Sequence, residues 1–343
     1  MLCDYHVHLE EGPYSMKWLE RTLRSYESTK KSNHQKSHTK EWIRYTTNLL
    51  SERLIKGAYD QEWIDLYLQE ALKKGIKEVG IVEHLYRFKE TRNYFEGNMK
   101  MDGSDIGQLQ TKWLNQVMTE NIEEFLEAIE KAKKRWHNYG VTLRVGVEAD
   151  YFEGAEEELR QLLDPIDCDF INGSIHFVDG WGFDNPQTKD HFQEYVLVDL
   201  YEKFFRCVQK GIESGLFDYM SHLDNIKVFN HIPKVEFLLP FYHSIAECLI
   251  KHNVATEVNS GLYYRFPVKE KCPGGAFLSI LASHSVLFTV SSDAHFPEDL
   301  GAYVDQSIRD LSNLGVTEIA TFNQKKRIMK PLQISNPVFS KGR

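Results

Sequence analysis

Two histidines stand two positions apart near the start of the chain, at His6 and His8. In an extended strand, side chains two positions apart lie on the same face, so both imidazoles would point the same way. Neutral imidazole is a common ligand of transition metals, and a pair on one face can bind one ion together. The pair therefore predicts a metal site, although two histidines this close also occur by chance.

Similar residue types follow several other apolar runs along the chain. These runs are short and typical of buried strands. The residues at their ends are His84, Glu148, His176, His222, Asp293 and His295. Any one of them could instead cap a helix or lie hydrogen-bonded on the surface. The carboxyl ends of parallel strands meet on one face, so a single polynuclear metal site explains the whole set more simply.

The elements that would position these residues alternate along most of the chain. The expected strands cover residues 2–7, 78–83, 142–149, 170–175, 217–221, 255–258, 286–291 and 318–322. The expected helices between them include residues 60–74, 120–139, 195–210, 235–251 and 298–313. Strand–helix alternation repeated this often favours a parallel sheet, as a barrel or a doubly wound layer, in one α/β domain.

One polar, basic segment at residues 29–40 departs from this alternation, between expected helices at 16–26 and 40–54. Its composition predicts a solvated helical insertion with a mobile tip. The alternative is a lid whose basic tip attracts an anionic substrate.

Composition narrows the class of protein. The chain has 343 residues, of which 42% are hydrophobic and 27% charged, as in an ordinary globular protein. A net charge of −9 argues against a general nucleic-acid binder. No apolar run approaches the ~18 residues of a membrane span, and the first residues lack the apolar stretch of a signal peptide, so we expect a cytoplasmic protein. The 5 cysteines form no CxxC pair and are expected to be inert thiols.

The motifs occur in a characteristic order: HxH, EH, a strand-end Glu, SIH, a strand-end His and DAH. This order resembles the PHP (polymerase and histidinol phosphatase) superfamily. The stretches GVEADYFEG, FINGSIHF, SHLDNIKVF, EVNSGLYYR and SSDAHFPEDLG are similar to its monofunctional histidinol-phosphate phosphatase branch. The resemblance implies a distorted (β/α)7 TIM-like barrel over residues 1–332. The composition adds the expectation of a helical insertion after the first strand, at roughly 19–58, and of a flexible tail at 333–343.

The resemblance also implies how metal ions would be held. The first ion would be bound by His6, His8, Glu148 and Asp293. Glu148 would bridge to a second ion bound by His176 and His222, and a third would be bound by His84 and His295. The family's remaining ligand position holds Tyr14 here, so we expect Glu11 to replace it, with Glu10 as the alternative. This ligand set suits two to three divalent ions of Zn, Mn or Fe.

The activity implied is hydrolysis of L-histidinol phosphate to L-histidinol and phosphate in histidine biosynthesis. The metal ions would neutralise the phosphate oxygens and lower the pKa of a bridging water, and the resulting hydroxide would attack phosphorus without a phosphoenzyme. We assign catalytic roles to Glu148, Asp293 and His295. Arg265 is expected to hold the phosphate by a bidentate contact.

Several points stay open at the level of sequence. The substrate amine needs a carboxylate such as Glu153, Asp179 or Asp224, and nothing in the sequence chooses between them. The same site could act on another small phosphate monoester, such as a nucleotide or a sugar phosphate. A remoter alternative is a metal-binding regulatory module without catalysis. No nucleic-acid or membrane partner is expected, and the oligomeric state is open.

Overall fold

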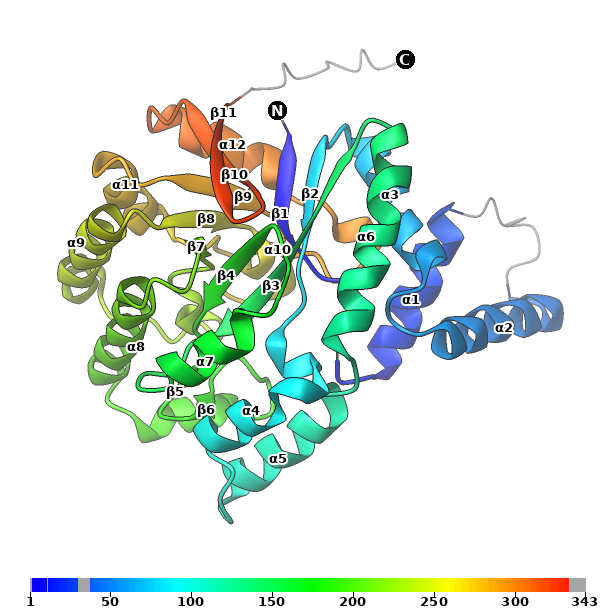
Figure 1. Ribbon diagram of the computed structural model, residues 1–343. Coiled ribbons are helices and arrows are strands. Elements are labelled where there is room, and N and C mark those ends of the chain that lie inside the picture. The colour runs from blue at the N-terminus through cyan, green and yellow to red at the C-terminus, as the bar shows by residue number, and fades with distance from the viewer. Residues whose placement is uncertain (1, 11, 30–37, 333–343) are drawn as a thin grey trace.

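The computed structural model describes residues 2–10, 12–29 and 38–332 (Figure 1). Seven parallel strands form one sheet in the order β1-β2-β3-β4-β7-β8-β9. They are β1 (Cys3–Val7), β2 (Glu78–Ile81), β3 (Thr142–Asp150), β4 (Phe170–Ser174), β7 (Tyr219–Met220), β8 (Ala255–Asn259) and β9 (Phe288–Ser291). The first and last strands meet where His8 N donates to Ala294 O at 2.7 Å, which nearly closes the sheet. The predicted seven-stranded TIM-like barrel is therefore confirmed.

Helices surround this barrel (Figure 1). The helices that follow or link its strands are α3 (Gln61–Lys74), α4 (Arg92–Asn98), α5 (Asp105–Val117), α6 (Ile122–Asn138), α7 (Glu156–Leu163), α8 (Leu197–Glu213), α9 (Val235–His252), α10 (Gly261–Arg265), α11 (Gly275–Ser283) and α12 (Val304–Asn313). Helix α6 shows how the sequence specifies them. Its buried residues Phe125, Ile129, Ala132 and Trp136 recur every three or four positions and so lie on one face.

The helix expected over residues 298–313 begins later than predicted. Residues Pro297–Asp299 form a short 3-10 turn, and the helix starts at Val304. Gly301 (φ 70°) and Tyr303 (φ 57°) between them have left-handed backbone conformations, which interrupt a helix.

Aromatic side chains fill the barrel interior at the amino ends of its strands. Tyr5 lies 5.3 Å from Phe170 between ring centroids, and Phe170 lies 5.9 Å from Tyr219. Gly80 and Gly146 leave room for the Phe170 ring, because a Cβ atom on either would lie 2.8 or 2.5 Å from it. This packing leaves the carboxyl ends of the strands for polar residues.

The last expected strand, at 318–322, forms but does not join the parallel sheet. It becomes β10 (Glu318–Asn323), which pairs antiparallel with β11 (Lys326–Pro331). The hairpin covers the amino end of the barrel, where Phe322 N donates to the Tyr5 hydroxyl at 2.9 Å. A second small hairpin joins β5 (Phe177–Val178) and β6 (Trp181–Gly182) beyond the carboxyl end of β4.

Two helices, α1 (Met16–Thr29) and α2 (Lys40–Lys56), lie between β1 and α3. They occupy the place of the expected insertion, and Figure 1 shows α2 projecting away from the barrel. Most of the polar tip expected to act as a lid or a solvated turn lies outside the described residues, as does the expected tail at 333–343. The domain boundaries themselves stay a prediction.

Among the described residues, no helix has both the length and the apolar character needed to cross a membrane.

Candidate metal centre

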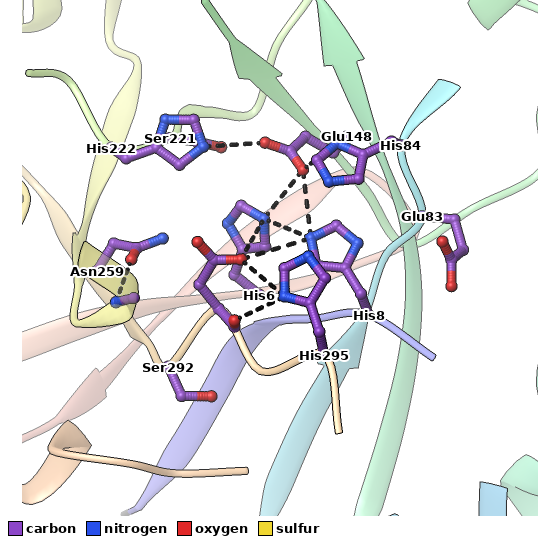
Figure 2. Close-up of polar contacts among 12 residues, drawn as sticks. His6, His8, Glu83, His84, Glu148, Ser221, His222, Asn259, Ser292 and His295 are labelled. Atoms are coloured by element: carbon purple, nitrogen blue, oxygen red, sulfur yellow. Dashed lines mark hydrogen bonds and ion pairs between the residues drawn. The ribbon is translucent and has the colours of Figure 1, made fainter. Parts of the chain in front are cut away.

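The centre begins at the carboxyl end of β1, where His6 and His8 point to the same side as the strand periodicity predicts (Figure 2). Both side chains are completely buried. Their Nε2 atoms lie 3.0 Å apart. The backbone after them is held by the buried Glu83, whose Oε1 accepts from Leu9 N at 2.9 Å.

Glu148 of β3 lies at the middle of the cluster and is completely buried. Its Oε2 lies 3.1 Å from His6 Nε2, 3.3 Å from His8 Nε2 and 2.8 Å from His84 Nδ1. Its Oε1 lies 3.0 Å from His222 Nε2, at the carboxyl end of β7. One carboxylate therefore contacts imidazoles from several strand ends (Figure 2).

Asp293 and His295 complete the cluster from the segment after β9. The Asp293 Oδ1 atom lies 3.7 Å from His8 Nε2 and 3.9 Å from His6 Nε2. The His295 ring stacks on His8 with centroids 4.4 Å apart. A glycine is required at Gly261, because a Cβ there would lie 2.6 Å from Asp293 Oδ2.

His176 enters from the segment after β4. Its Nε2 lies 3.7 Å from Glu148 Oε1, and its Nδ1 lies 2.8 Å from Asp150 Oδ1. Burial alone would lower the pKa of His176, but Asp150 outweighs it and raises that pKa to about 10. The structure thus brings eight of the nine expected ligands together: His6, His8, His84, Glu148, His176, His222, Asp293 and His295. The ninth, Glu11, lies outside the described residues.

The alternative ligand Glu10 already has partners in the protein. Trp18 Nε1 donates to its Oε1 at 2.6 Å, and Arg53 of α2 forms a buried ion pair with its other oxygen. Tyr14, at the family's ligand position, is 46% exposed. The ligand that would complete a third metal position is therefore the one part of the predicted set that the described residues do not supply.

The donor geometry fits cations better than hydrogen bonds among the side chains alone. His6 Nε2 and His8 Nε2 lie 3.0 Å apart, and at most one proton can lie between these two nitrogens. His84 Nδ1 is within 2.8 Å of Glu148 Oε2, yet it is buried without a correctly oriented hydrogen bond to any described residue. A mixed set of imidazoles and carboxylates around one buried space is the ligand chemistry of Zn, Mn or Fe.

The charges of Glu148 and of the histidines around it shift one another's pKa values. Burial alone would raise the pKa of Glu148, but His84 and His6 outweigh it and hold that pKa well below its ordinary value. Burial and the neighbouring His84 lower the pKa of His8 well below its ordinary value. Burial alone would lower the pKa of His6, but Glu257 and Glu148 outweigh it and raise that pKa well above its ordinary value. His6 and His176 would therefore have to release their protons when a metal ion binds.

Two carboxylates outside the predicted set orient these histidines. Glu257 of β8 lies 3.2 Å from His6 Nδ1, and its Oε1 also accepts from His222 N at 3.0 Å. Asp150 contacts His176 in the same way. Such outer carboxylates fix which ring nitrogen faces a metal. The available sequence signal for Glu257, which the sequence analysis missed, was a carboxylate within an otherwise uncharged expected strand.

A cavity of about 580 Å³ opens over the cluster. Arg265 at the end of α10 lines it, with Nη1 at 2.7 Å from His295 Nδ1 and 3.5 Å from Asp293 Oδ1. Asp184, just after β6, also lines it, together with aromatic residues such as Trp113 and Phe266. Burial raises the pKa of Asp184 above its ordinary value.

The three carboxylates considered for the substrate amine do not line this cavity. Glu153 pairs with Arg206 at 3.1 Å and Asp179 with Lys203 at 2.5 Å, both on exposed surface. Asp224 is buried and pairs with Lys227 at 2.9 Å. Asp184, which the sequence analysis did not single out, is a carboxylate outside the metal cluster that does line the cavity.

A barrel whose strand ends carry this His and carboxylate cluster defines a class of metal-binding α/β proteins. The chain belongs to the PHP domain family, whose model matches residues 55–261. It is 29% identical over 208 residues to the protein named "Probable histidinol-phosphatase" of Deinococcus radiodurans, covering 60% of this chain and 77% of that protein. It is 22% identical over 236 residues to a protein of the same name from Clostridium acetobutylicum, covering 64% and 88%.

The fold is shared with a solved structure. A histidinol phosphate phosphatase of Lactococcus lactis, in complex with zinc, L-histidinol and phosphate, superposes with a TM-score of 0.61 at 17% identity. The match covers 76% of this chain and 91% of that one.

Proposed function

We propose that this protein is a metal-dependent phosphatase that hydrolyses L-histidinol phosphate to L-histidinol and phosphate. The observation that carries the proposal is the convergence of six histidines and two carboxylates beneath a cavity that also contains an arginine. Similarity to proteins named histidinol-phosphatase supports this choice of substrate. The fold shared with a phosphatase that binds zinc, L-histidinol and phosphate agrees with it.

The metal assignment that we propose is the one that the family resemblance implies. His6, His8, Glu148 and Asp293 would hold one ion, and His176 and His222 would hold a second together with Glu148. His84 and His295 would bind a third ion, and we propose Glu11 as its remaining ligand. Divalent ions in such a site neutralise phosphate oxygens and lower the pKa of water.

Arg265 would bind the phosphate, since its guanidinium lines the cavity beside Asp293 and His295. Asp293 and His295 would then lie next to the reacting phosphate, while Glu148 would hold the ligands together from beneath. We propose direct transfer of the phosphoryl group to water rather than to a protein nucleophile.

Asp184 would bind the cationic amine of the substrate. The cavity is lined by aromatic side chains that suit an imidazole ring, and a carboxylate at its edge supplies the opposite charge. Asp184→Asn should therefore raise KM for L-histidinol phosphate more than for p-nitrophenyl phosphate, which has no amine.

The decisive experiment measures phosphate release from L-histidinol phosphate, p-nitrophenyl phosphate and a panel of nucleotides and sugar phosphates. The protein is first reconstituted with Mn²⁺ or Zn²⁺. We expect strong preference for L-histidinol phosphate, loss of activity with a chelator, and recovery when metal is restored. Glu148→Gln serves as the inactive control.

Other outcomes would select the alternatives. Turnover only of other phosphate monoesters would keep the phosphatase assignment and discard this substrate. Metal binding without turnover of any phosphoester would favour a regulatory module. The cytoplasmic location expected from the sequence stays a prediction.

A further inference from the structure

A second group of metal-binding side chains lies in the outer helical layer, where α8 and α9 pack side by side (Figure 1). Helix α8 ends at Glu213 and α9 ends at His252, and each is followed within a few residues by the start of a barrel strand. Both helix ends therefore lie at the amino end of the barrel. The candidate metal centre lies at the opposite, carboxyl end.

Three different donors meet at this point. A carboxylate oxygen of Glu213, the Sγ of Cys248 and a ring nitrogen of His252 all lie within 4.8 Å of one another. Cys248 and His252 are four positions apart on α9, so they lie one turn apart on the same face. Glu213 reaches them from the neighbouring helix.

The local contacts leave these donors able to bind an ion. His252 Nε2 is buried and has no hydrogen-bond partner among the residues that the structure describes. The Cys248 Sγ lies 3.9 Å from Gln209 O, at the limit of a sulfur hydrogen bond. Glu213 accepts from Gln209 Nε2 at 3.0 Å and from Lys210 Nζ at 2.8 Å, but a carboxylate has about four lone-pair positions.

The surrounding charge also favours a cation. The carboxyl ends of α8 and α9 meet here, and the carbonyl groups at a helix end carry a partial negative charge. Lys210 and Lys251 are competing cations near Cys248. Lys251 is exposed, and the Lys210 side chain is 47% exposed, so both can turn toward solvent.

We propose that Glu213, Cys248 and His252 form a zinc-binding site that links α8 to α9. Thiolate, imidazole and carboxylate are the three side-chain ligands of zinc, and three of them leave a fourth position for water. When Zn²⁺ binds, the Cys248 thiol releases its proton to solvent and its sulfur bonds to the metal, with no change in oxidation state. The bound ion connects the two helices at the end of the barrel away from the cavity.

Cobalt spectroscopy of the full-length protein tests this site separately from the other centre. Co²⁺ bound to a thiolate absorbs in the near ultraviolet, whereas the described ligands of the barrel centre include no cysteine. We expect a Co²⁺ titration to produce this band and Zn²⁺ to remove it by displacement. Cys248→Ser should abolish the band, and His252→Gln should weaken Co²⁺ binding by about 10-fold or more.

Cys207→Ser is the matched control, because Cys207 lies on α8, one of the two linked helices, but belongs to no such group among the described residues. This variant should keep the band, and Cys248→Ser should keep the phosphate-release activity of the parent. Absence of a thiolate band would overturn the proposal, as would a band that survives Cys248→Ser. If Cys248→Ser does not fold, Glu213→Gln and His252→Gln replace it, because both residues are partly exposed. An unchanged Co²⁺ affinity in both variants, measured from the thiolate band, would overturn the proposal.

Discussion

At the scale of single residues, Glu148 shows how the barrel assembles its polar centre. A buried carboxylate is costly unless charged or hydrogen-bonded partners surround it. Here imidazole nitrogens of four histidines lie within 3.3 Å of its two oxygens. These histidines come from three different strands or from the segments that follow them. The cost of burying the carboxylate is therefore offset by the same histidines that we expect to bind metal.

Glu257→Gln tests whether the outer carboxylate positions His6. Glutamine keeps the size of the side chain but removes the charge that holds His6 Nδ1. We expect metal affinity to fall by about 10- to 100-fold, as measured by competition with a chelating dye. Glu270→Gln is the control, since Glu270 pairs with Lys227 rather than with a histidine. Equal affinities in both variants would contradict the positioning role.

Arg265→Ala tests phosphate binding. Loss of a charge-assisted contact of about 1.5–3 kcal/mol should raise KM roughly 10- to 100-fold. Metal content, measured by elemental analysis, should stay unchanged because no proposed ligand is removed. Arg206→Ala, which removes an exposed arginine paired with Glu153, should leave both quantities unaltered. Unchanged kinetics in Arg265→Ala would remove this residue from the site.

At the scale of elements, the inserted helices are joined to the centre by one buried ion pair. Arg53 of α2 pairs with Glu10, which follows the two histidines of β1, and both side chains are at most 2% exposed. The Arg53 guanidinium also lies 4.6 Å from the Trp63 ring of α3. The insertion therefore helps to fix the segment that follows the first metal ligands.

Arg53→Met should destabilise the protein by about 3–5 kcal/mol, because it leaves the Glu10 carboxylate buried without its partner. The double variant Glu10→Gln, Arg53→Met should recover much of this loss, as measured by urea unfolding. Glu10→Gln alone should keep the full metal content. A drop in metal content would instead identify Glu10 as the missing ligand.

Gly146→Ala tests how the barrel interior is packed. The new methyl group would lie 2.5 Å from the Phe170 ring, so either the ring or the strand must move. We expect a loss of about 1–3 kcal/mol in unfolding free energy. Gly97→Ala in α4 is the control, because nothing lies within 4 Å of its new methyl group and alanine favours a helix. Equal stability of the two variants would show that Phe170 adjusts freely.

At the scale of the whole molecule, the five cysteines share two properties: each is a free thiol, and burial raises the pKa of each. None is paired in a disulfide, and only Cys207 is more than slightly exposed. Burial raises the pKa of Cys207 and of Cys248 to about 11 and that of Cys168 to about 12. Burial also raises the pKa of Cys3 and Cys272. The interpretation as inert thiols therefore stands for Cys3, Cys168, Cys207 and Cys272, whereas Cys248 is a ligand of the proposed zinc site.

Thiol reactivity should therefore depend on unfolding and on pH. The thiolate is the reactive form, and a pKa of about 11 leaves about 0.1% thiolate at pH 8. Alkylation of the native, metal-free protein should be slow at pH 8 and accelerate about 10-fold for each pH unit toward 11. Mass spectrometry should show five rapidly modified thiols only after denaturation. Rapid modification of the native protein at pH 8 would contradict the burial of these side chains.

The sequence by itself determined the α/β class and the main cluster, and the family resemblance added the choice of a barrel over a doubly wound layer. Strand periodicity placed His6 and His8 on one side, and the rule that parallel strand ends share a face brought together Glu148, Asp293 and the other histidines. The first rule concerns residues close together in sequence, and the second applies to any parallel barrel. Neither requires knowledge of which side chains are in contact. Similarity of motif order then selected the family.

Only the tertiary structure decided which further groups face this cluster. Glu257 contacts His6 across 251 positions of sequence, and Asp150 contacts His176 across 26. Whether Asp184 or the surface carboxylates Glu153 and Asp179 face the cavity depends on how the segments beyond β3 and β4 fold back. The hairpin that includes β10 likewise became a cover because Phe322 fits among aromatic rings from distant strands. Such contacts depend on strand register and side-chain packing between remote segments, which local sequence patterns do not specify.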